Sequence, residues 1–377
     1  MTRMRRHSTQ FGFLQTGLSL IELMIAMAVG LILIAGVLSI FISSRQSYGI
    51  NGAVGQIQEN GRFALDFIRT AARKAGYMGC ATSALTVSYL MPAADPTAYN
   101  FSQPLYGFGY AAVPPAPAEN PAPDPVGTNW APGLDAFLTG KVLPNTDVLV
   151  VRFTQRNPIY ITNIASAGAV VATVNTLGLP DQPDLAPGNL FVASNCVNAI
   201  VMQATALTAG PALEYTAPGE VPGNTPGQVL PQSFIGAAVV SPTTAVFFVG
   251  VGADGSPALF EANTDTTGAG GVGGNGFMAA AELVPGVENM RVLYGVDLTG
   301  SQVPSEYDTA GAVTTAGLWG SVVSVRVALL LRSNIGAVPL PAAAPTYTLV
   351  DNTITAPQDT RLRQVFTATI GLRNSLP

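Results

Sequence analysis

The chain has 377 residues and a formal net charge of −5, which argues against non-specific nucleic-acid binding through bulk charge. Its one histidine is His7, so the rest of the chain cannot supply the histidine of a Ser-His-Asp triad or of a metal site. Charged residues make up only 10%, and the 40 glycines and 29 prolines are typical of a loop-rich β protein.

Residues 1–17 form a polar leader that carries three arginines and no acid. Positive charge before a first apolar segment predicts that this end stays in the cytoplasm and that the rest of the chain is exported. From Leu23 to Ile42 there follow 20 uncharged residues. As a helix this run spans about 30 Å, the thickness of the hydrocarbon core of a bilayer. Glu22 lies at its start, and an acid within a membrane segment indicates a functional role.

The junction between leader and apolar run reads Gly17-Leu18-Ser19-Leu20-Ile21-Glu22-Leu23-Met24. It closely resembles the class III signal of type IV prepilins and pseudopilins. The resemblance implies cleavage after Gly17 by a prepilin peptidase and N-methylation of Leu18, the new N-terminus, where the family usually has phenylalanine. Glu22 becomes the fifth mature residue, the position of the family's hallmark glutamate. In a filament of apolar helices its carboxylate needs a cation, which the N-terminal amine of a neighbouring subunit supplies. A signal anchor with a stray acid is the alternative.

The helix is expected to continue beyond the membrane, with residues 18–42 as its transmembrane half and residues 43–78 as its amphipathic half. From Arg45 to Ala75 apolar or small residues recur every three or four positions, which predicts one face packed on a globular head. Each interrupting glycine costs about 1 kcal/mol relative to alanine in a helix interior. The stretch Gly49–Gly55 is therefore the expected weak point, and Gly76 is expected near the helix end.

Residues 79–377 are expected to form a large β-rich head, which makes the predicted fold α+β and pilin-like. Composition predicts a Pro/Ala-rich surface loop near 111–134 and a Thr/Gly-rich mobile loop near 264–276. Six apolar runs are predicted as strands: Val148–Phe153, Val197–Met202, Thr244–Val249, Arg291–Val296, Val322–Leu331 and Gln364–Ile370.

The two cysteines, Cys80 and Cys196, are expected to form a disulfide, because an exported chain enters an oxidising compartment; two buried free thiols are the alternative. Two cysteines alone cannot close a zinc site. The turn at Asp297–Ser301 lacks the alternating acidic ligands of a calcium loop. The G-x-G-x-x-G run at 250–255 precedes an apparent strand rather than a helix, which favours a hairpin over a nucleotide site. No catalytic residue, metal or cofactor is predicted.

Four further side chains have structural interpretations. Arg361 and Arg363 flank Leu362 and are predicted to form a salt-bridged surface pair, with an anion site as the alternative. Trp130 and Trp319 are predicted to be core or loop anchors rather than ligand platforms. Exposed sheet edges are the candidate partner surfaces of such a head.

Three C-terminal segments, Leu283–Gly295, Val322–Ser333 and Arg361–Phe366, resemble PilW-type minor pilins, and Ala75–Cys80 fits the same family. The resemblance implies a structural protein rather than an enzyme, a minor pilin that helps to initiate or prime assembly of the type IV pilus and to form its tip complex. The implied partners are prepilin peptidase, other minor pilins, the major pilin and a tip adhesin. The implied location is the inner membrane, crossed once with the N-terminus cytoplasmic and the head periplasmic, and then the pilus at the cell surface.

Two other functions remain open. A J-type pseudopilin of a type II secretion system has a similar architecture, although the C-terminal segments favour the pilus form. A secreted binding module or hydrolase held by a signal anchor belongs to a different class. The sequence gives this alternative no support, because it contains no catalytic histidine and no acid pair at recognisable spacing.

Overall fold

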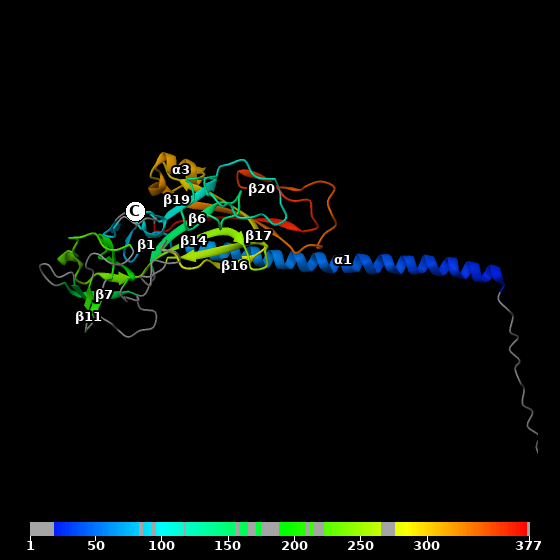
Figure 1. Cartoon of the computed structure of the whole chain (residues 1–377), viewed down its shortest axis with the longest axis horizontal. Helices are drawn as coiled ribbons and strands as arrows, with labels where there is room; N and C mark the ends of the chain where they lie inside the picture. Colours follow the sequence, from blue (N-terminus) through cyan, green and yellow to red (C-terminus); the bar gives the residue numbers. More distant parts are fainter. Residues whose placement is uncertain are drawn as a thin grey trace, which may run out of the picture. The chain divides into compact units, whose positions relative to one another are not determined.

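The structure is a computed structural model that describes residues 19–82, 86–91, 96–116, 118–154, 158–164, 171–174, 188–204, 206–208, 212–214, 222–264 and 276–374. The chain divides into two compact units, one ending at Gly52 and the other beginning at Ala53. The first contains the N-terminal part of helix α1 (Leu20–Ala72), and the second contains the remainder of α1 and a β-rich head (Figure 1). The predicted α+β, pilin-like fold is confirmed.

Helix α1 is continuous over 53 residues. The expected weak stretch Gly49–Gly55 is helical throughout, and the boundary between the two units lies within it. The helix ends at Ala72, six residues before the boundary predicted at residue 78. The reason is a turn that leads to Gly76, whose φ of +75° suits glycine alone. The Gly76 N–H donates to the carbonyl of Arg152 at 2.9 Å and thereby leaves the helical pattern.

The part of α1 that follows Ala53 packs one face on the head. Its buried residues recur at three- and four-residue spacing: Ile57, Gly61, Ala64, Leu65, Ile68, Ala71 and Ala72. They share one apolar core with strands of the head. At Gly61 an added Cβ would lie 2.6 Å from Cζ of Phe366. Alanine at this position would therefore force the Phe366 ring to move.

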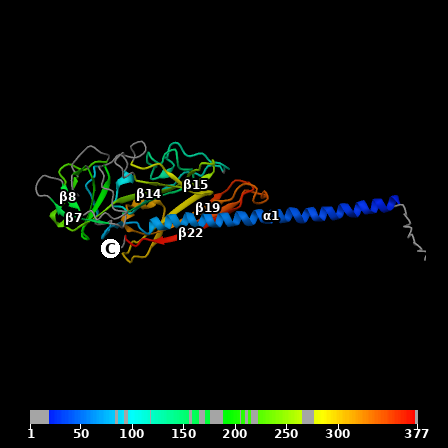
Figure 2. The same cartoon turned by 90° about the horizontal axis from the view of Figure 1, so that it is seen from below.

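A four-stranded antiparallel sheet in the order β18-β17-β19-β22 contributes to this core. Its strands are β18 (Glu306–Asp308), β17 (Val287–Val296), β19 (Val322–Arg332) and β22 (Arg363–Gly371). The last three were predicted. β22 pairs with β19 over nine residues without a register shift, and it lies at the margin of the sheet beside α1 (Figure 2).

The core continues into a six-stranded antiparallel sheet in the order β16-β15-β14-β6-β4-β5. The strands are β16 (Ala281–Pro285), β15 (Pro257–Asn263), β14 (Pro242–Val251), β6 (Val148–Thr154), β4 (Leu105–Tyr110) and β5 (Trp130–Ala131). Two of them, β6 and β14, were predicted as apolar runs, and β15 is the apparent strand expected after the glycine motif. β14 and β15 form a hairpin around Asp254-Gly255, so the hairpin interpretation of the glycine motif is confirmed.

An eight-stranded sheet lies at one end of the head, where β7 and β11 are labelled in Figure 1. Its order is β11-β12-β8-β7-β13-β9-β10-β3, and only β10 overlaps a predicted strand. The bounds are β11 (Ala206–Thr208), β12 (Ala212–Glu214), β8 (Val171–Val174), β7 (Ile159–Ile164), β13 (Ala238–Val240), β9 (Leu190–Ser194), β10 (Ala199–Gln203) and β3 (Thr86–Ser88).

Shorter elements complete the described head: β1 (Tyr77–Met78), β2 (Ala81–Thr82), α2 (Pro96–Tyr99), η2 (Gln232–Phe234), α3 (Ala310–Ala316), η4 (Trp319–Ser321), β20 (Thr346–Leu349) and β21 (Asn352–Thr355). The described residues of the expected loop near 111–134 are irregular apart from the two residues of β5. The expected loop near 264–276 falls almost wholly on residues 265–275, outside the described residues. Trp130 and Trp319 are 3% and 4% exposed, which confirms them as anchors.

Candidate functional site

Glu22 lies in the first turn of α1, and Ser19 stands immediately before the helix. The Ser19 N–H donates to Glu22 Oε2 at 3.0 Å, and the Glu22 N–H donates to Ser19 Oγ at 3.3 Å. This reciprocal pair is a capping box, which satisfies N–H groups that the start of a helix leaves free. The sequence contains the corresponding signal, Ser-x-x-Glu, but the assembly role predicted for Glu22 takes no account of it.

Gly17 and Leu18, the predicted cleavage site and methylated N-terminus, lie outside the described residues. Ser19 is the second residue of the predicted mature chain. Cleavage after Gly17 would therefore place a new amine one residue before the capping box. The structure shows Glu22 as a cap for its own helix, and the pairing of its carboxylate with a cation stays a prediction.

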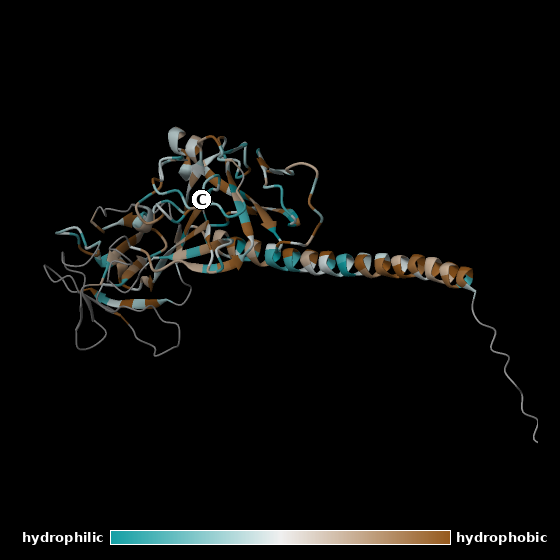
Figure 3. Cartoon of the chain, turned by 45° about the vertical axis from the view of Figure 1, so that its right-hand side comes forward, coloured by the Kyte–Doolittle hydropathy of each residue, from teal (hydrophilic) through white to brown (hydrophobic). Residues whose placement is uncertain are grey.

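After Glu22, the first part of helix α1 consists mainly of hydrophobic residues, which are brown in Figure 3. Each large apolar side chain from Leu23 to Ile42 keeps at least 51% of its surface exposed. Among the described residues, α1 is the one helix long and apolar enough to cross a membrane. Such a surface is unfavourable in water, so this segment needs a bilayer or other apolar helices around it.

In the head, Arg363 occupies the centre of a buried charge cluster at the start of β22. Its side chain is fully buried, and its guanidinium donates to Glu288 Oε2 at 2.6 Å and to Asp359 Oδ1 at 2.7 Å. Burial alone raises the pKa of Asp359, but the hydrogen bonds from Arg363 prevail and hold it below the ordinary 3.8. For Arg363, burial lowers the pKa, but the two carboxylates outweigh this effect and raise it.

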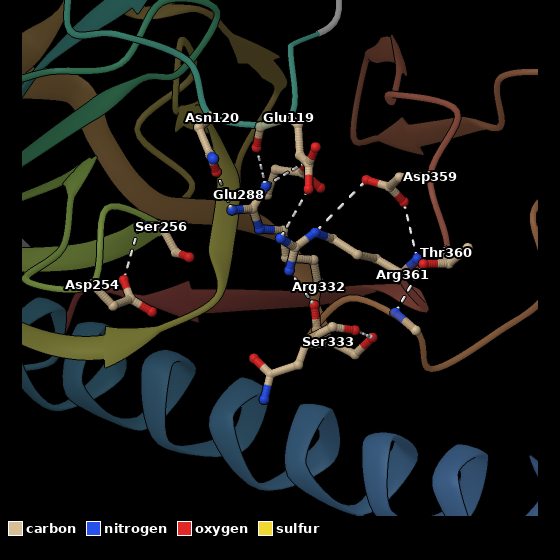
Figure 4. Close-up of polar contacts among 12 residues, drawn as sticks. Glu119, Asn120, Asp254, Ser256, Glu288, Arg332, Ser333, Asp359, Thr360 and Arg361 are labelled. Carbon is tan, nitrogen blue, oxygen red and sulfur yellow. Dashed lines mark hydrogen bonds and ion pairs between the residues drawn. The ribbon is translucent and has the colours of Figure 1, made fainter.

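Two more arginines extend the cluster to the loop near 111–134 (Figure 4). Arg332 donates to the carbonyl of Glu119 and to Oδ1 of Asn120 at 3.2 Å. Arg361 pairs with the Glu119 carboxylate at 3.3 Å and donates to the carbonyl of Ser333 at 3.0 Å. The cluster therefore fastens β17, β19, β22 and the loop to one another.

The predicted pair Arg361 and Arg363 is salt-bridged, but the prediction of a surface position was wrong. The side chains are 10% and 0% exposed. Burial is tolerated because the planar guanidinium of Arg363 meets two carboxylates in a bidentate manner. The sequence shows the charges but not the carboxylates that make burial possible.

A second buried ion pair, which sequence reasoning missed, joins the four- and six-stranded sheets. Asp147, next to β6, lies 2.8 Å from Arg291 of β17. The same carboxylate accepts the N–H groups of Tyr110 at 2.9 Å and Val292 at 2.8 Å. Burial raises the pKa of Asp147, although Arg291 opposes the shift. Nothing in the sequence around Asp147, an acid directly before an apolar strand, indicates that it pairs with the distant Arg291.

Cys80 and Cys196 are joined by a disulfide, as the sequence predicts, across 116 positions of the chain. Cys80 follows β1 a few residues after the end of α1, and Cys196 lies in the turn between β9 and β10. The bond therefore connects the chain next to α1 with the eight-stranded sheet.

The acidic turn at Asp297 is occupied by its own backbone. Asp297 Oδ1 accepts the N–H groups of Thr299 and Gly300, each at 2.9 Å, and Oδ2 accepts the N–H of Gln302 at 2.6 Å. Within the described ranges, no group of three His, Cys, Asp or Glu residues could hold a metal ion. The features that distinguish this chain are consequently its exposed apolar helix, the glutamate at the start of that helix and the β-rich head.

Two family models match the chain. Residues 13–38 match the prokaryotic N-terminal methylation motif, and residues 246–374 match the type IV pilus-assembly protein W, PilW. No curated protein matches the chain, and no solved structure does. The N-terminal match, together with the apolar helix and the β-rich head, identifies a type IV prepilin-like protein. More specifically, the two matches support a PilW-type protein with a role in type IV pilus assembly.

The PilW match covers β17, β19 and β22, which carry the three C-terminal resemblances. The methylation motif implies processing by prepilin peptidase and association with pilus components. Helix and motif together fit a single-pass, membrane-anchored pilin of structural function.

Proposed function

We propose that this chain is a minor pilin that helps to initiate or prime assembly of the type IV pilus and forms part of its tip complex. The observation that carries the proposal is the apolar, exposed first part of α1, with Glu22 at its start, on a chain whose head contains a match to PilW. The apolar surface provides the lateral contacts with other pilins, and the head provides the specific ones.

Processing by prepilin peptidase would create the cation with which the Glu22 carboxylate pairs. Cleavage after Gly17 frees the amine of Leu18, and methylation leaves that amine basic and therefore cationic. In the bilayer, the Glu22 carboxylate of one subunit and the Leu18 amine of its neighbour form an ion pair, which is strong where water is excluded. The three leader arginines keep residues 1–17 cytoplasmic, and the head lies in the periplasm before assembly.

A Glu22→Gln variant separates the two uses of Glu22. Glutamine can replace glutamate in a capping box, so the helix start is preserved while the negative charge is lost. We expect normal membrane insertion and processing, with incorporation into pili reduced about tenfold or more by loss of the ion pair. The matched control is Ser19→Ala, which weakens the cap and keeps the charge. Wild-type incorporation of Glu22→Gln would remove the role assigned to Glu22.

Priming and tip position need their own measurements. Mass spectrometry of the mature chain is expected to find N-methylated Leu18 at its N-terminus. Deletion of the chain is expected to reduce the number of pili per cell rather than their length. An epitope inserted after Gly300, in an exposed turn, is expected to label pilus tips. Label along the whole filament would contradict the tip position.

A further inference from the structure

β22 presents a long open sheet edge. It has nine residues, and in the described part of the head it pairs with β19 alone. The other strands that end the three large sheets have five residues or fewer: β18, β16, β5, β11 and β3. Short edge strands are one common protection against pairing with another chain. β22 lacks that protection.

The backbone groups that face outward on β22 follow from its register. The Ser333 N–H donates to the Leu362 carbonyl, and the Leu372 N–H donates to the Val323 carbonyl. Both bonds fit the pairing of β22 with β19. In an antiparallel pair such bonds recur at every second residue, so the even-numbered residues of β22 bond to β19.

The odd-numbered residues therefore direct their N–H and C=O groups away from the sheet. From residue 365 onward these are Val365, Thr367, Thr369 and Gly371, and in the described structure none of their backbone groups has a hydrogen-bond partner outside β19. Thr367, Thr369 and Gly371 are exposed, and a Cβ on Gly371 would meet nothing within 4 Å. The open edge thus offers four N–H donors and four C=O acceptors.

Several other usual protections are also missing from this edge. β22 contains no proline, no lysine and no bulge. Its one charge, Arg363, is held inside the head by Glu288 and Asp359. The side chains beside the open groups are β-branched or small, which suits pairing with another strand.

The direction of β22 relative to α1 restricts the occupant. Phe366 packs at Gly61, and the Asn374 side chain donates to the Ala75 carbonyl at 3.5 Å. Residue numbers therefore increase in the same direction along β22 and along the helix, from the Phe366–Gly61 contact to the Asn374–Ala75 contact. β22 thus runs parallel to the part of α1 after Ala53. Antiparallel pairing of two β22 edges would point the helix segments after Ala53 of the two copies in opposite directions. Copies that follow one another along one filament share one orientation and cannot adopt that arrangement.

We propose that the outer edge of β22 receives an uncharged edge strand of a different pilin subunit by antiparallel strand addition. The inference rests on the proposed assembly function and assigns one of its contact surfaces. β22 packs directly on the part of α1 after Ala53, so its open edge lies beside that part of the helix. Backbone bonds then supply affinity, and side chains next to Thr367 supply specificity.

The test uses the full-length chain in pilus-producing cells. p-Benzoylphenylalanine is introduced in place of Thr367 and, as a control, in place of Thr353, an exposed threonine of β21. After irradiation, position 367 is expected to give an adduct with another pilin subunit, identified by mass spectrometry, and position 353 is expected to give none. No adduct, the same adduct from both positions, or an adduct only with a second copy would overturn the proposal.

Matched substitutions test the backbone contribution. Thr367→Pro removes an outward N–H, which an edge strand tolerates, whereas Thr367→Val keeps the N–H and the side-chain shape. We expect the adduct from a probe at position 369 to fall about tenfold or more with proline and to persist with valine. Unchanged cross-linking in the proline variant would overturn the proposal. Protease resistance of the head in the proline variant checks that the variant folds. The cross-linking probe at position 367, described above, tests the same edge in a chain without the proline.

The Glu22→Gln variant separates the two proposals. If it blocks assembly while Thr367→Pro assembles and cross-links as wild type, the strand-addition surface is wrong and the assembly function stands. If the Glu22→Gln variant assembles normally, the proposed assembly role of Glu22 is wrong, whatever the result for the edge of β22.

Discussion

Helix α1 contains two segments of similar regularity and opposite surroundings. A Cβ on Gly36, in the first segment, would meet nothing within 4 Å, whereas a Cβ on Gly61, in the second, would collide with Phe366. The first segment is apolar all round and keeps its surface for other chains, while the second is amphipathic and is already covered by its own head. The comparison shows that the hydrophobic pattern distinguishes the two cases. A helix that is apolar on all sides has its surface available for other chains, whereas an amphipathic helix buries its apolar face on its own head.

The largest expected effect concerns the head on which the second segment packs. Arg363→Met leaves Glu288 and Asp359 buried without their main partner. We expect the free energy of unfolding of the head to fall by about 3–5 kcal/mol, measured by denaturant titration of the full chain in detergent. The control is Arg45→Met in α1 before Gly52, which is expected to leave head unfolding unchanged. Equal stability of the two variants would show that the cluster is not structural.

A glycine-to-alanine substitution is expected to change stability in opposite directions in the two segments. Gly61→Ala forces Phe366 to move and is expected to destabilise the head by about 1–3 kcal/mol, more than the gain in helix propensity. Gly36→Ala meets no neighbour and is expected to stabilise the helix by up to about 1 kcal/mol. Thermal unfolding monitored by circular dichroism distinguishes them. Adding Phe366→Leu to Gly61→Ala is expected to recover part of the loss, and additivity would contradict the proposed contact.

A smaller effect depends on pH. The pKa of Asp359 lies below its ordinary 3.8 in the folded head, because hydrogen bonds from Arg363 outweigh the burial that raises it. The folded state therefore binds this proton less readily, so the contribution of Asp359 is present above the ordinary pKa and is lost as the pH falls through the folded value. Asp359→Asn is expected to cost about 1 kcal/mol at pH 7 and less at pH 3. A difference that grows on acidification would contradict this account.

The smallest expected effect lies at the junction of the two segments. Gly52→Ala is expected to stabilise the helix locally by about 0.5–1 kcal/mol, because a Cβ there meets no neighbour. Hydrogen exchange of the Gly49–Gly55 amides would detect the change as slower exchange. If this stretch unwinds during assembly, as the sequence predicts for the weak point, the variant should also enter pili less efficiently. Faster exchange would show that alanine is not accommodated.

Much of the fold could be predicted because its signals are local. A continuous apolar run predicts the exposed segment of α1, and β-branched runs predict strands such as β6, β14 and β19. Most of the eight-stranded sheet could not be predicted, since its strands are short and several of its pairings join strands that are not consecutive in the chain. The weak signals of β7 and β13 acquire meaning only when a distant strand lies beside them.

The site shows the same division. The Gly17–Glu22 junction is a contiguous motif, whereas the burial of Arg363 depends on Glu288 and Asp359, which lie elsewhere in the chain. Charged residues are usually exposed, so a surface position is the natural expectation for an arginine pair. The sequence places Gly61 in the predicted amphipathic half of the helix, but the neighbour that makes a small residue favourable there, the ring of Phe366, is a tertiary contact.

The disulfide between Cys80 and Cys196 also has a mechanical meaning. It spans 116 positions, and Cys80 is eight residues beyond the end of α1. Tension applied to the eight-stranded sheet therefore has a covalent route to the helix through one sulfur bridge and a short tether. The load bypasses the long intervening chain and its hydrogen-bonded strands. A head fastened in this way can transmit a pulling force to its membrane helix without first unravelling the segment between the two cysteines.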